Sequence, residues 1–219
     1  MSRPPLSLDR VVDAASRVAD ASGLAGVSMR SVGRELGVEA MSLYHHVAGK
    51  EALLDGLADW VFARITVPRT GPDWRTEMEE RARSARAVLT AHPWGLGLLE
   101  SRRSPGPATL GHHDAVLGCL RSAGFSVPLA AHAFSVLDAY TYGFVLTEVN
   151  LPFEAGESAE DFVEDLGPIA DLYPHLTELV ADQIVGRDYA YGDEFDHGLA
   201  LVLDGLEARF SGDAPAPPP

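Results

Sequence analysis

The chain of 219 residues has a single cysteine, Cys119, and no apolar run long enough to cross a membrane. One cysteine cannot form an intrachain disulfide, and the N-terminus lacks the apolar core and cleavage site of a secretory signal. Nucleophile elbows, phosphate loops and metal-ligand spacings are also missing. We therefore expect a cytoplasmic protein that is not an enzyme and that uses no cofactor and no membrane.

Negative charge is in excess, with a net charge of −15, but it is unevenly distributed. Residues 1–65 hold seven Lys/Arg and eight Asp/Glu, whereas residues 66–219 hold ten Lys/Arg and twenty-four Asp/Glu. A polyanion would attract the less negative end of such a molecule. The acidic residues mainly keep the larger part soluble, so charge alone does not indicate a nucleic-acid partner.

Apolar residues recur at helical spacing and alternating strand patterns are scarce, which predicts an all-α fold. The first helix is expected over 7–22, between Ser7 and Gly23. A second helix begins at the N-cap Ser28 and ends at Gly37, and a third, short helix covers 39–46. After Gly49, a fourth apolar stripe is formed by Leu53, Leu54, Leu57, Val61 and Ile65.

Pro68, Gly71 and Pro72 interrupt the helical pattern, and we place a domain boundary there. Residues 1–66 are predicted to form a helix-turn-helix domain, 73–211 a larger helical domain and 212–219 a disordered tail. The later helices are expected over 73–92, 94–101, 107–124, 127–150, 158–172, 174–186 and 191–210.

Residues 28–46 indicate two short helices joined by a tight turn. The wedge between them can be filled by Val32, Leu36, Val38 and Leu43. The second helix is then too small for a core element and projects outward with hydrogen-bonding side chains, a shape that fits the DNA major groove. An ordinary helical hairpin is the alternative interpretation.

The stretch from Val27 to Leu53 resembles the tetracycline-repressor (TetR) family of transcriptional regulators. The resemblance is strongest in Ser42-Leu43-Tyr44-His45-His46-Val47 and in Gly49-Lys50-Glu51-Ala52-Leu53-Leu54. It is clear over residues 7–65. Beyond them it lies in length, helical content and general pattern, where the chain looks most like the tetracycline-repressor branch itself. The resemblance implies a ligand-responsive repressor that binds palindromic double-stranded operator DNA as a homodimer and is released by a small-molecule effector.

The resemblance also assigns roles to individual residues of the predicted DNA-binding domain. It implies backbone or base contacts for Ser28 and Arg30, base-edge contacts for Ala40, Met41 and Ser42, and phosphate contacts for Tyr44, His46 and Lys50. Lys50 opens a helix, where an ammonium and free backbone N–H groups can both meet a phosphate. Ala40 and Met41 are apolar, so they would contact thymine methyls rather than read bases through hydrogen bonds.

Two apolar stripes in the larger domain suit a four-helix dimer interface, although a subunit core explains them equally well. The first stripe holds Leu129, Val136, Tyr140, Phe144 and Leu151, and the second holds Phe195, Leu199, Val202, Leu206 and Phe210.

An effector pocket needs apolar walls and a few polar groups. The candidate residues are His92, Trp94, His113, His132, Asp138, Thr141, Tyr142 and Glu148. A buried carboxylate such as Asp138 needs a partner, which is either a ligand or a neighbouring Arg. His112 and His113 point in different directions on a helix, so we expect no metal site there.

Two other functions remain open at this point. One is a DNA-binding regulator that responds to a protein partner instead of a small molecule. The other is an all-α enzyme that uses some of the eight histidines.

Overall fold

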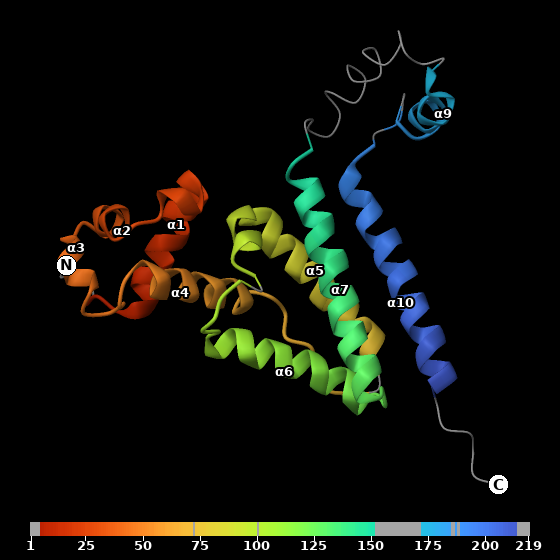
Figure 1. Cartoon of the computed structure of the whole chain (residues 1–219), viewed down its shortest axis with the longest axis horizontal. Helices are drawn as coiled ribbons and strands as arrows, with labels where there is room; N and C mark the ends of the chain where they lie inside the picture. The colour runs from red at the N-terminus through yellow and green to blue at the C-terminus, as the bar shows by residue number, and fades with distance from the viewer. Residues whose placement is uncertain are drawn as a thin grey trace.

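The computed structural model describes residues 5–71, 73–99, 101–151, 172–184, 187 and 189–213. Within these ranges all regular secondary structure is helical, so the prediction of an all-α fold is confirmed (Figure 1). Of the helices described, none combines the length and apolar character needed to cross a membrane.

Four helices form one end of the molecule (Figure 1). They are α1 (Leu8–Gly26), α2 (Met29–Leu36), α3 (Ala40–Leu43) and α4 (Lys50–Phe62). Helix α1 continues past its predicted end, but its path breaks at Gly23, whose φ of 65° is left-handed. Helix α3 is shorter than predicted, a single turn followed by a non-helical turn over 44–46.

The turn between α2 and α3 follows from local sequence. Ser28 accepts a hydrogen bond from the Ser31 N–H at 3.1 Å, and the Ser31 hydroxyl accepts one from the Ser28 N–H at 2.9 Å, so the two serines form a capping box. Gly37 ends α2 in the left-handed conformation, with φ of 62°. At Gly33 an added Cβ would lie 3.0 Å from the Val38 carbonyl oxygen, so this glycine lets the two helices approach closely.

In the larger part, the described residues form seven further elements. They are α5 (Trp74–Ala91), the 3-10 helix η1 (Pro93–Gly97), α6 (Pro107–Ser122), α7 (Val127–Glu148), α9 (Pro174–Gln183), the 3-10 helix η3 (Tyr191–Asp193) and α10 (Glu194–Asp213). The predicted helix over 94–101 is therefore only a 3-10 turn. Helix α10 runs two residues into the predicted tail. Residues 214–219, and the predicted helix over 158–172 except Leu172, lie outside the described residues.

Two apolar cores hold the elements together. The first combines buried residues of α1 to α4 with Leu89 of α5, Trp94 of η1 and Val145 of α7. The second lies among α5, α6, α7 and α10 and contains Met78 and Leu137. Burial of apolar surface is the main stabilising contribution to such packing. Because the first core includes residues of α5, η1 and α7, it joins the four small helices to the larger part.

The two stripes considered for dimerisation mostly face the subunit's own core. Phe144, Phe195 and Leu199 are buried in the second core. Helices α7 and α10 pack against each other, which explains why their largest apolar residues point inward. The outward surfaces of the same helices carry Val136, which is 41% exposed, and Leu201, which is 62% exposed.

Candidate nucleic-acid interface and effector pocket

Helix α3 and the turn that follows it carry five of the eight residues predicted to contact DNA. Met41 is 72% exposed and Tyr44 is 50% exposed, whereas Ala40, Ser42 and His46 are half-buried. Leu43 is fully buried and anchors the helix to the first core. The anchored face and the exposed face are therefore separate, as a helix that inserts into a groove requires.

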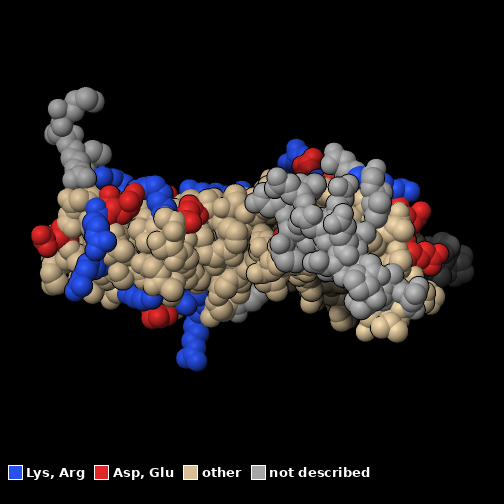
Figure 2. All heavy atoms as spheres, turned by 90° about the horizontal axis from the view of Figure 1, so that it is seen from above, with Lys and Arg blue, Asp and Glu red and all other residues tan. Residues whose placement is uncertain are grey.

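Unpaired cations lie beside α3. Arg30, Arg34 and Lys50 are exposed and form no ion pair with any carboxylate of the described residues. Most arginines of the larger part are instead neutralised by carboxylates: Arg69, Arg75, Arg81, Arg83, Arg86 and Arg102. Figure 2 shows Lys and Arg side chains projecting from the end of the molecule formed by α1 to α4. This end therefore has positive charge available for a polyanion despite the net negative charge of the chain.

The first turn of α4 is open to an anion. Its N-cap is Gly49, which has φ of 140° and no side chain with which to cap the helix. The free N–H groups of the first turn and the Lys50 ammonium are thus available at the same point. Ser28, in contrast, uses its side chain in the capping box of α2.

Three carboxylates follow one side of α4 at intervals of four residues, and we call Glu51, Asp55 and Asp59 the α4 carboxylate row. Arg102 donates hydrogen bonds to Glu51 Oε2 at 2.8 Å and to Asp55 Oδ1 at 2.7 Å. These two hydrogen bonds raise the pKa of the Arg102 guanidinium. The row therefore binds the segment that leads into α6.

The third carboxylate of the row caps α6 from another helix. Asp59 Oδ1 accepts hydrogen bonds from the Thr109 N–H at 2.8 Å and from the Thr109 hydroxyl at 3.1 Å. The N-cap residue of α6 is Gly106, and a Cβ added there would collide with the Asp59 carboxylate. The absence of a side chain at Gly106 lets the carboxylate occupy the usual position of an N-cap group.

A pocket of about 210 Å³ lies between α4 and α6. Its lining consists of Ala58, Phe62, Leu98, Arg102, Pro105, Thr109 and His113. The His113 ring meets the rings of Phe62 and Phe134 edge to face, with both centroid distances at 5.1 Å. The pocket is thus walled by aromatic side chains and by Arg102 and Thr109, which also bind the α4 carboxylate row.

His92 and Trp94 lie at the junction of the two parts of the molecule instead. Asp20 of α1 contacts His92 Nδ1 at 2.7 Å and accepts the Trp94 Nε1–H at 2.6 Å. Trp60 of α4 packs edge to face on the His92 ring at 4.9 Å. These contacts tie η1 to α1.

Asp138 belongs to a buried polar cluster and its partner is an arginine. Arg81 is 1% exposed and donates to Asp138 Oδ1 at 2.5 Å and, through Nε, to His112 Nε2 at 2.9 Å. Tyr142 donates to Asp138 Oδ2 at 3.2 Å. Burial, the Arg81 charge and His113 lower the pKa of His112 to about 3. The Arg81 pairing removes the need for a ligand to compensate the Asp138 charge.

The remaining candidates are also distributed over the larger part. Glu148 forms a bidentate ion pair with Arg86, at 3.0 and 2.5 Å. Thr141 is buried and donates to the Leu137 carbonyl oxygen, and His132 is exposed. Only His113 of the eight predicted effector residues lines the α4–α6 pocket. The described residues contain no group of three His, Cys, Asp or Glu that could hold a metal ion.

Sequence reasoning did not single out Phe62, Arg102 and Thr109 as pocket residues. The one available signal was the spacing of Glu51, Asp55 and Asp59, which places three acids on one side of a helix. Nothing in the sequence indicated the Arg102 and Thr109 side chains that approach them. Arg34 was missed as well, although its place four residues after Arg30 puts it on the same side of α2.

Comparison with known proteins identifies the class. Residues 67–210 match the family model of the tetracycline repressor-like C-terminal domain, and residues 11–57 match that of the bacterial regulatory proteins of the tetR family. The chain is 34% identical to the transcriptional repressor DrrR1 of Streptomyces coeruleorubidus, over 94% of this chain and 78% of that protein. It is also 34% identical to the class A tetracycline repressor from transposon 1721 of Escherichia coli, over 93% of this chain and 92% of the repressor.

Similar solved structures indicate the same family as these relatives. Apo ActR from Streptomyces coelicolor is 29% identical, with a TM-score of 0.80 over 97% of this chain and all of ActR. ActR in complex with actinorhodin is 30% identical, with a TM-score of 0.77 over 94% of this chain and 97% of ActR.

The fold and the exposed α3 define a helix-turn-helix transcriptional regulator with a larger helical domain. The chain belongs to the tetracycline-repressor family, as the sequence between Val27 and Leu53 predicted. The relatives named above are regulators of transcription and not enzymes.

Proposed function

We propose that the protein is a homodimeric repressor that acts in the cytoplasm, reads a two-fold operator through α3 and is released by a small aromatic effector. The observation that carries the proposal is the set of unpaired cations Arg30, Arg34 and Lys50 around an exposed α3. The arginines along α5, in contrast, are balanced by carboxylates.

The chemistry of each side chain supports a different contact with the operator. Lys50 and the open first turn of α4 suit a phosphate, and Tyr44 and His46 on the turn after α3 suit further phosphates. Ala40, Met41 and Ser42 suit base edges, with Met41 placed to contact a thymine methyl. Arg30 has a free guanidinium for a base or a phosphate, whereas the hydroxyl and the backbone N–H of Ser28 are both engaged in the capping box of α2.

A single one-turn recognition helix makes too few contacts for specific binding, so two copies are required. The outward face of α7 carries Ser135, Val136, Ala139 and Gly143, all exposed, and that of α10 carries Leu201 and Gly205. Small residues let helix backbones approach closely across an interface. We expect α7 and α10 of two subunits to form a four-helix contact through these residues.

The effector site is proposed in the pocket between α4 and α6. The aromatic rings of Phe62 and His113 suit a flat aromatic molecule, and Arg102 and Thr109 supply polar contacts. ActR binds actinorhodin, which supports a small-molecule effector for this chain too. A volume of about 210 Å³ is small for such a ligand, so binding would have to widen the pocket.

Widening the pocket gives a route to DNA release. Arg102 and Thr109 line the pocket and also bind the α4 carboxylate row. A ligand that pushes them aside pulls on α4, which carries Lys50 at its other end. By linkage, the ligand weakens operator binding only to the extent that it prefers the displaced arrangement.

The test is selection of binding sites from a random pool of duplex DNA by the purified chain. We expect recovered sequences to be inverted repeats with half-sites about one helical turn, roughly 34–36 Å, apart. The selection is repeated with Lys50→Ala as a control for binding through the proposed face. Recovery of single half-sites, or of no consensus, would refute the dimeric operator model.

A further inference from the structure

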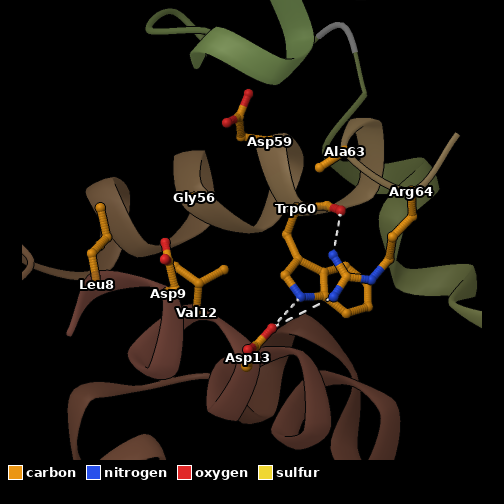
Figure 3. A pocket seen from close by; sticks show the side chains of 9 residues that line it. All are labelled: Leu8, Asp9, Val12, Asp13, Gly56, Asp59, Trp60, Ala63 and Arg64. Atoms are coloured by element: carbon orange, nitrogen blue, oxygen red, sulfur yellow. Dashed lines mark hydrogen bonds and ion pairs between the residues drawn. The ribbon is translucent and has the colours of Figure 1, made fainter. Parts of the chain in front are cut away.

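A groove lies between the N-terminal half of α1 and the C-terminal half of α4. It is distinct from the proposed DNA-binding face and from the proposed effector pocket. Helices α1 and α4 meet at Gly56, where an added Cβ would lie 2.8 Å from Val12 Cγ2. Beside this crossing the groove has a volume of about 260 Å³ (Figure 3). Its lining consists of Leu8, Asp9, Val12, Asp13, Gly56, Asp59, Trp60, Ala63 and Arg64.

A guanidinium group already occupies one corner of the groove. The Arg64 guanidinium lies 3.3 Å from the centroid of the Trp60 ring, and its Nη2 lies 3.5 Å from Asp13 Oδ1. Asp13 Oδ1 also accepts the Trp60 Nε1–H at 2.7 Å, which fixes the indole ring (Figure 3). The corner therefore combines an aromatic face and a carboxylate, the two groups that bind a planar cation from above and from its edge.

Arg64 is not a permanent part of the wall. Its Nη1 also donates a hydrogen bond to the Trp60 carbonyl oxygen at 2.9 Å, but the residue follows the end of α4 in a turn and its side chain is 41% exposed, so solvent already reaches it. Partial burial lowers the pKa of its guanidinium more than Asp13 raises it. The contact with Trp60 thus costs the cation some hydration, and release of Arg64 would restore that hydration.

The groove holds more negative charge than the Arg64 guanidinium neutralises. Asp9 and Asp13 stand on the α1 side and Asp59 on the α4 side. Asp13 contacts Arg64, and Asp59 is engaged by Thr109. The Asp9 carboxylate forms no hydrogen bond or ion pair within the described chain, and Leu8 beside it is 49% exposed. One carboxylate and one apolar surface in the groove are therefore left for a ligand.

We propose that this groove is a binding site for a small molecule that carries a guanidinium group on a short apolar arm, and that Arg64 is its tethered competitor. The guanidinium would take the place of Arg64 between Trp60 and Asp13, and the arm would lie on Leu8 and Val12 towards Asp9. The site belongs to the helix-turn-helix end of the molecule and is separate from the pocket proposed for the effector.

The test titrates the full chain with butylguanidinium chloride, and with the uncharged butylurea as a control of the same shape, at constant ionic strength. Calorimetry should detect saturable binding of the cation only. Arg64→Ala should bind it about fivefold more tightly, because the tethered competitor is gone. In the Arg64→Ala background, Asp13→Asn should weaken binding by at least about fivefold, since it keeps the acceptor for Trp60 but removes the charge.

Arg209→Ala serves as a matched control, because Arg209 is an exposed arginine on α10, remote from the groove. Arg209→Ala should bind butylguanidinium with the same affinity as the unmodified chain. If Asp13→Asn does not fold, Asp9→Asn in the Arg64→Ala background replaces it and should also weaken binding. Equal binding of butylurea, no gain in Arg64→Ala, or no loss in the Asp variants would overturn the proposal.

Discussion

Asp59 of α4 accepts two hydrogen bonds from Thr109 of α6, from the backbone N–H at 2.8 Å and from the hydroxyl at 3.1 Å. A carboxylate at the start of a helix satisfies a free N–H group and interacts favourably with the helix dipole. Here the carboxylate comes from the helix that carries Lys50, so the cap of α6 also connects the proposed DNA-binding and effector-binding parts.

The cap predicts a specific loss of stability. Asp59→Ala should lower the free energy of unfolding by about 1 kcal/mol, the usual value of an N-cap side chain. Asp59→Asn keeps an acceptor oxygen and should lose clearly less. Urea unfolding followed by circular dichroism measures both values. Equal losses in the two variants would show that hydrogen bonding to Thr109 contributes little.

Lys50 and Ser42 are predicted to act differently on the operator. Lys50→Ala should weaken binding to all sequences alike and reduce the slope of log K against log salt by about 0.9 for each phosphate that the protein no longer neutralises. Ser42→Ala should change the preference among operator variants instead. Fluorescence anisotropy at several salt concentrations gives both quantities, with Arg209→Ala as the control. A change of base preference in Lys50→Ala would contradict these roles.

The Arg81–Asp138 pair is predicted to be structural. Asp138→Ala should lower the free energy of unfolding by about 3–5 kcal/mol, because it leaves a buried guanidinium without its counter-charge. The double variant Arg81→Met/Asp138→Leu removes both charges and should recover much of that loss. Chemical unfolding of Asp138→Ala, of the single variants Arg81→Met and Asp138→Leu, and of the double variant forms the test. If the loss in the double variant equals the sum of the losses in the two single variants, the two side chains are not coupled.

His112 predicts a dependence of stability on pH. The pKa of His112 is about 3 in the folded protein, below the ordinary value of 6.5. Between these two pH values the unfolded chain therefore binds a proton at His112 and the folded chain does not. The His112 contribution therefore lowers stability as pH falls from about 6.5 towards 3, by about 1.4 kcal/mol per pH unit within that window. His112→Gln keeps an acceptor for Arg81 and should unfold with a shallower pH slope between pH 6 and pH 5. Identical slopes would contradict the burial of a neutral His112.

The helical fold could be predicted because its signals are local. Gly37, Ser28 and the apolar spacing of Val32, Leu36 and Leu43 act within a few residues, so the helix-turn-helix was recognisable from sequence. The short η1 was not, since Pro93 and two glycines favour a 3-10 turn where apolar spacing alone suggested a longer helix. The outward face of α7 that we propose for dimerisation was indicated only by Val136, because small residues such as Gly143 give no apolar signal.

The surroundings of the effector candidates could not be predicted from the sequence. A polar residue in an apolar helix must have a partner, but sequence does not reveal which partner. The partner of Asp138 is Arg81, fifty-seven positions away, and the partner of Trp94 is Asp20, seventy-four positions away. Such pairings depend on how helices pack, which is a property of the whole chain.

Arg102 and Arg75 offer a matched comparison for the link between the two parts. Arg102 joins the segment before α6 to Glu51 and Asp55, and Arg75 joins α5 to Asp204 and Glu207 of α10. Both are arginines near the surface that pair with two carboxylates of another element, and Arg75 also pairs with Glu79 of its own helix. Only Arg102 touches the helix that carries Lys50.

Arg102→Gln is therefore predicted to weaken operator binding about fivefold, because α4 loses a restraint on its orientation and binding must then order it. Arg75→Gln should leave operator binding unchanged. Both variants should unfold within about 1 kcal/mol of the unmodified protein, since ion pairs near the surface contribute little to stability. Anisotropy titrations with a selected operator, together with urea unfolding, compare the two. If neither variant changes operator affinity, the α4 carboxylate row does not position α4 on DNA; if both do, the effect comes from the missing positive charge and not from the interaction with α4.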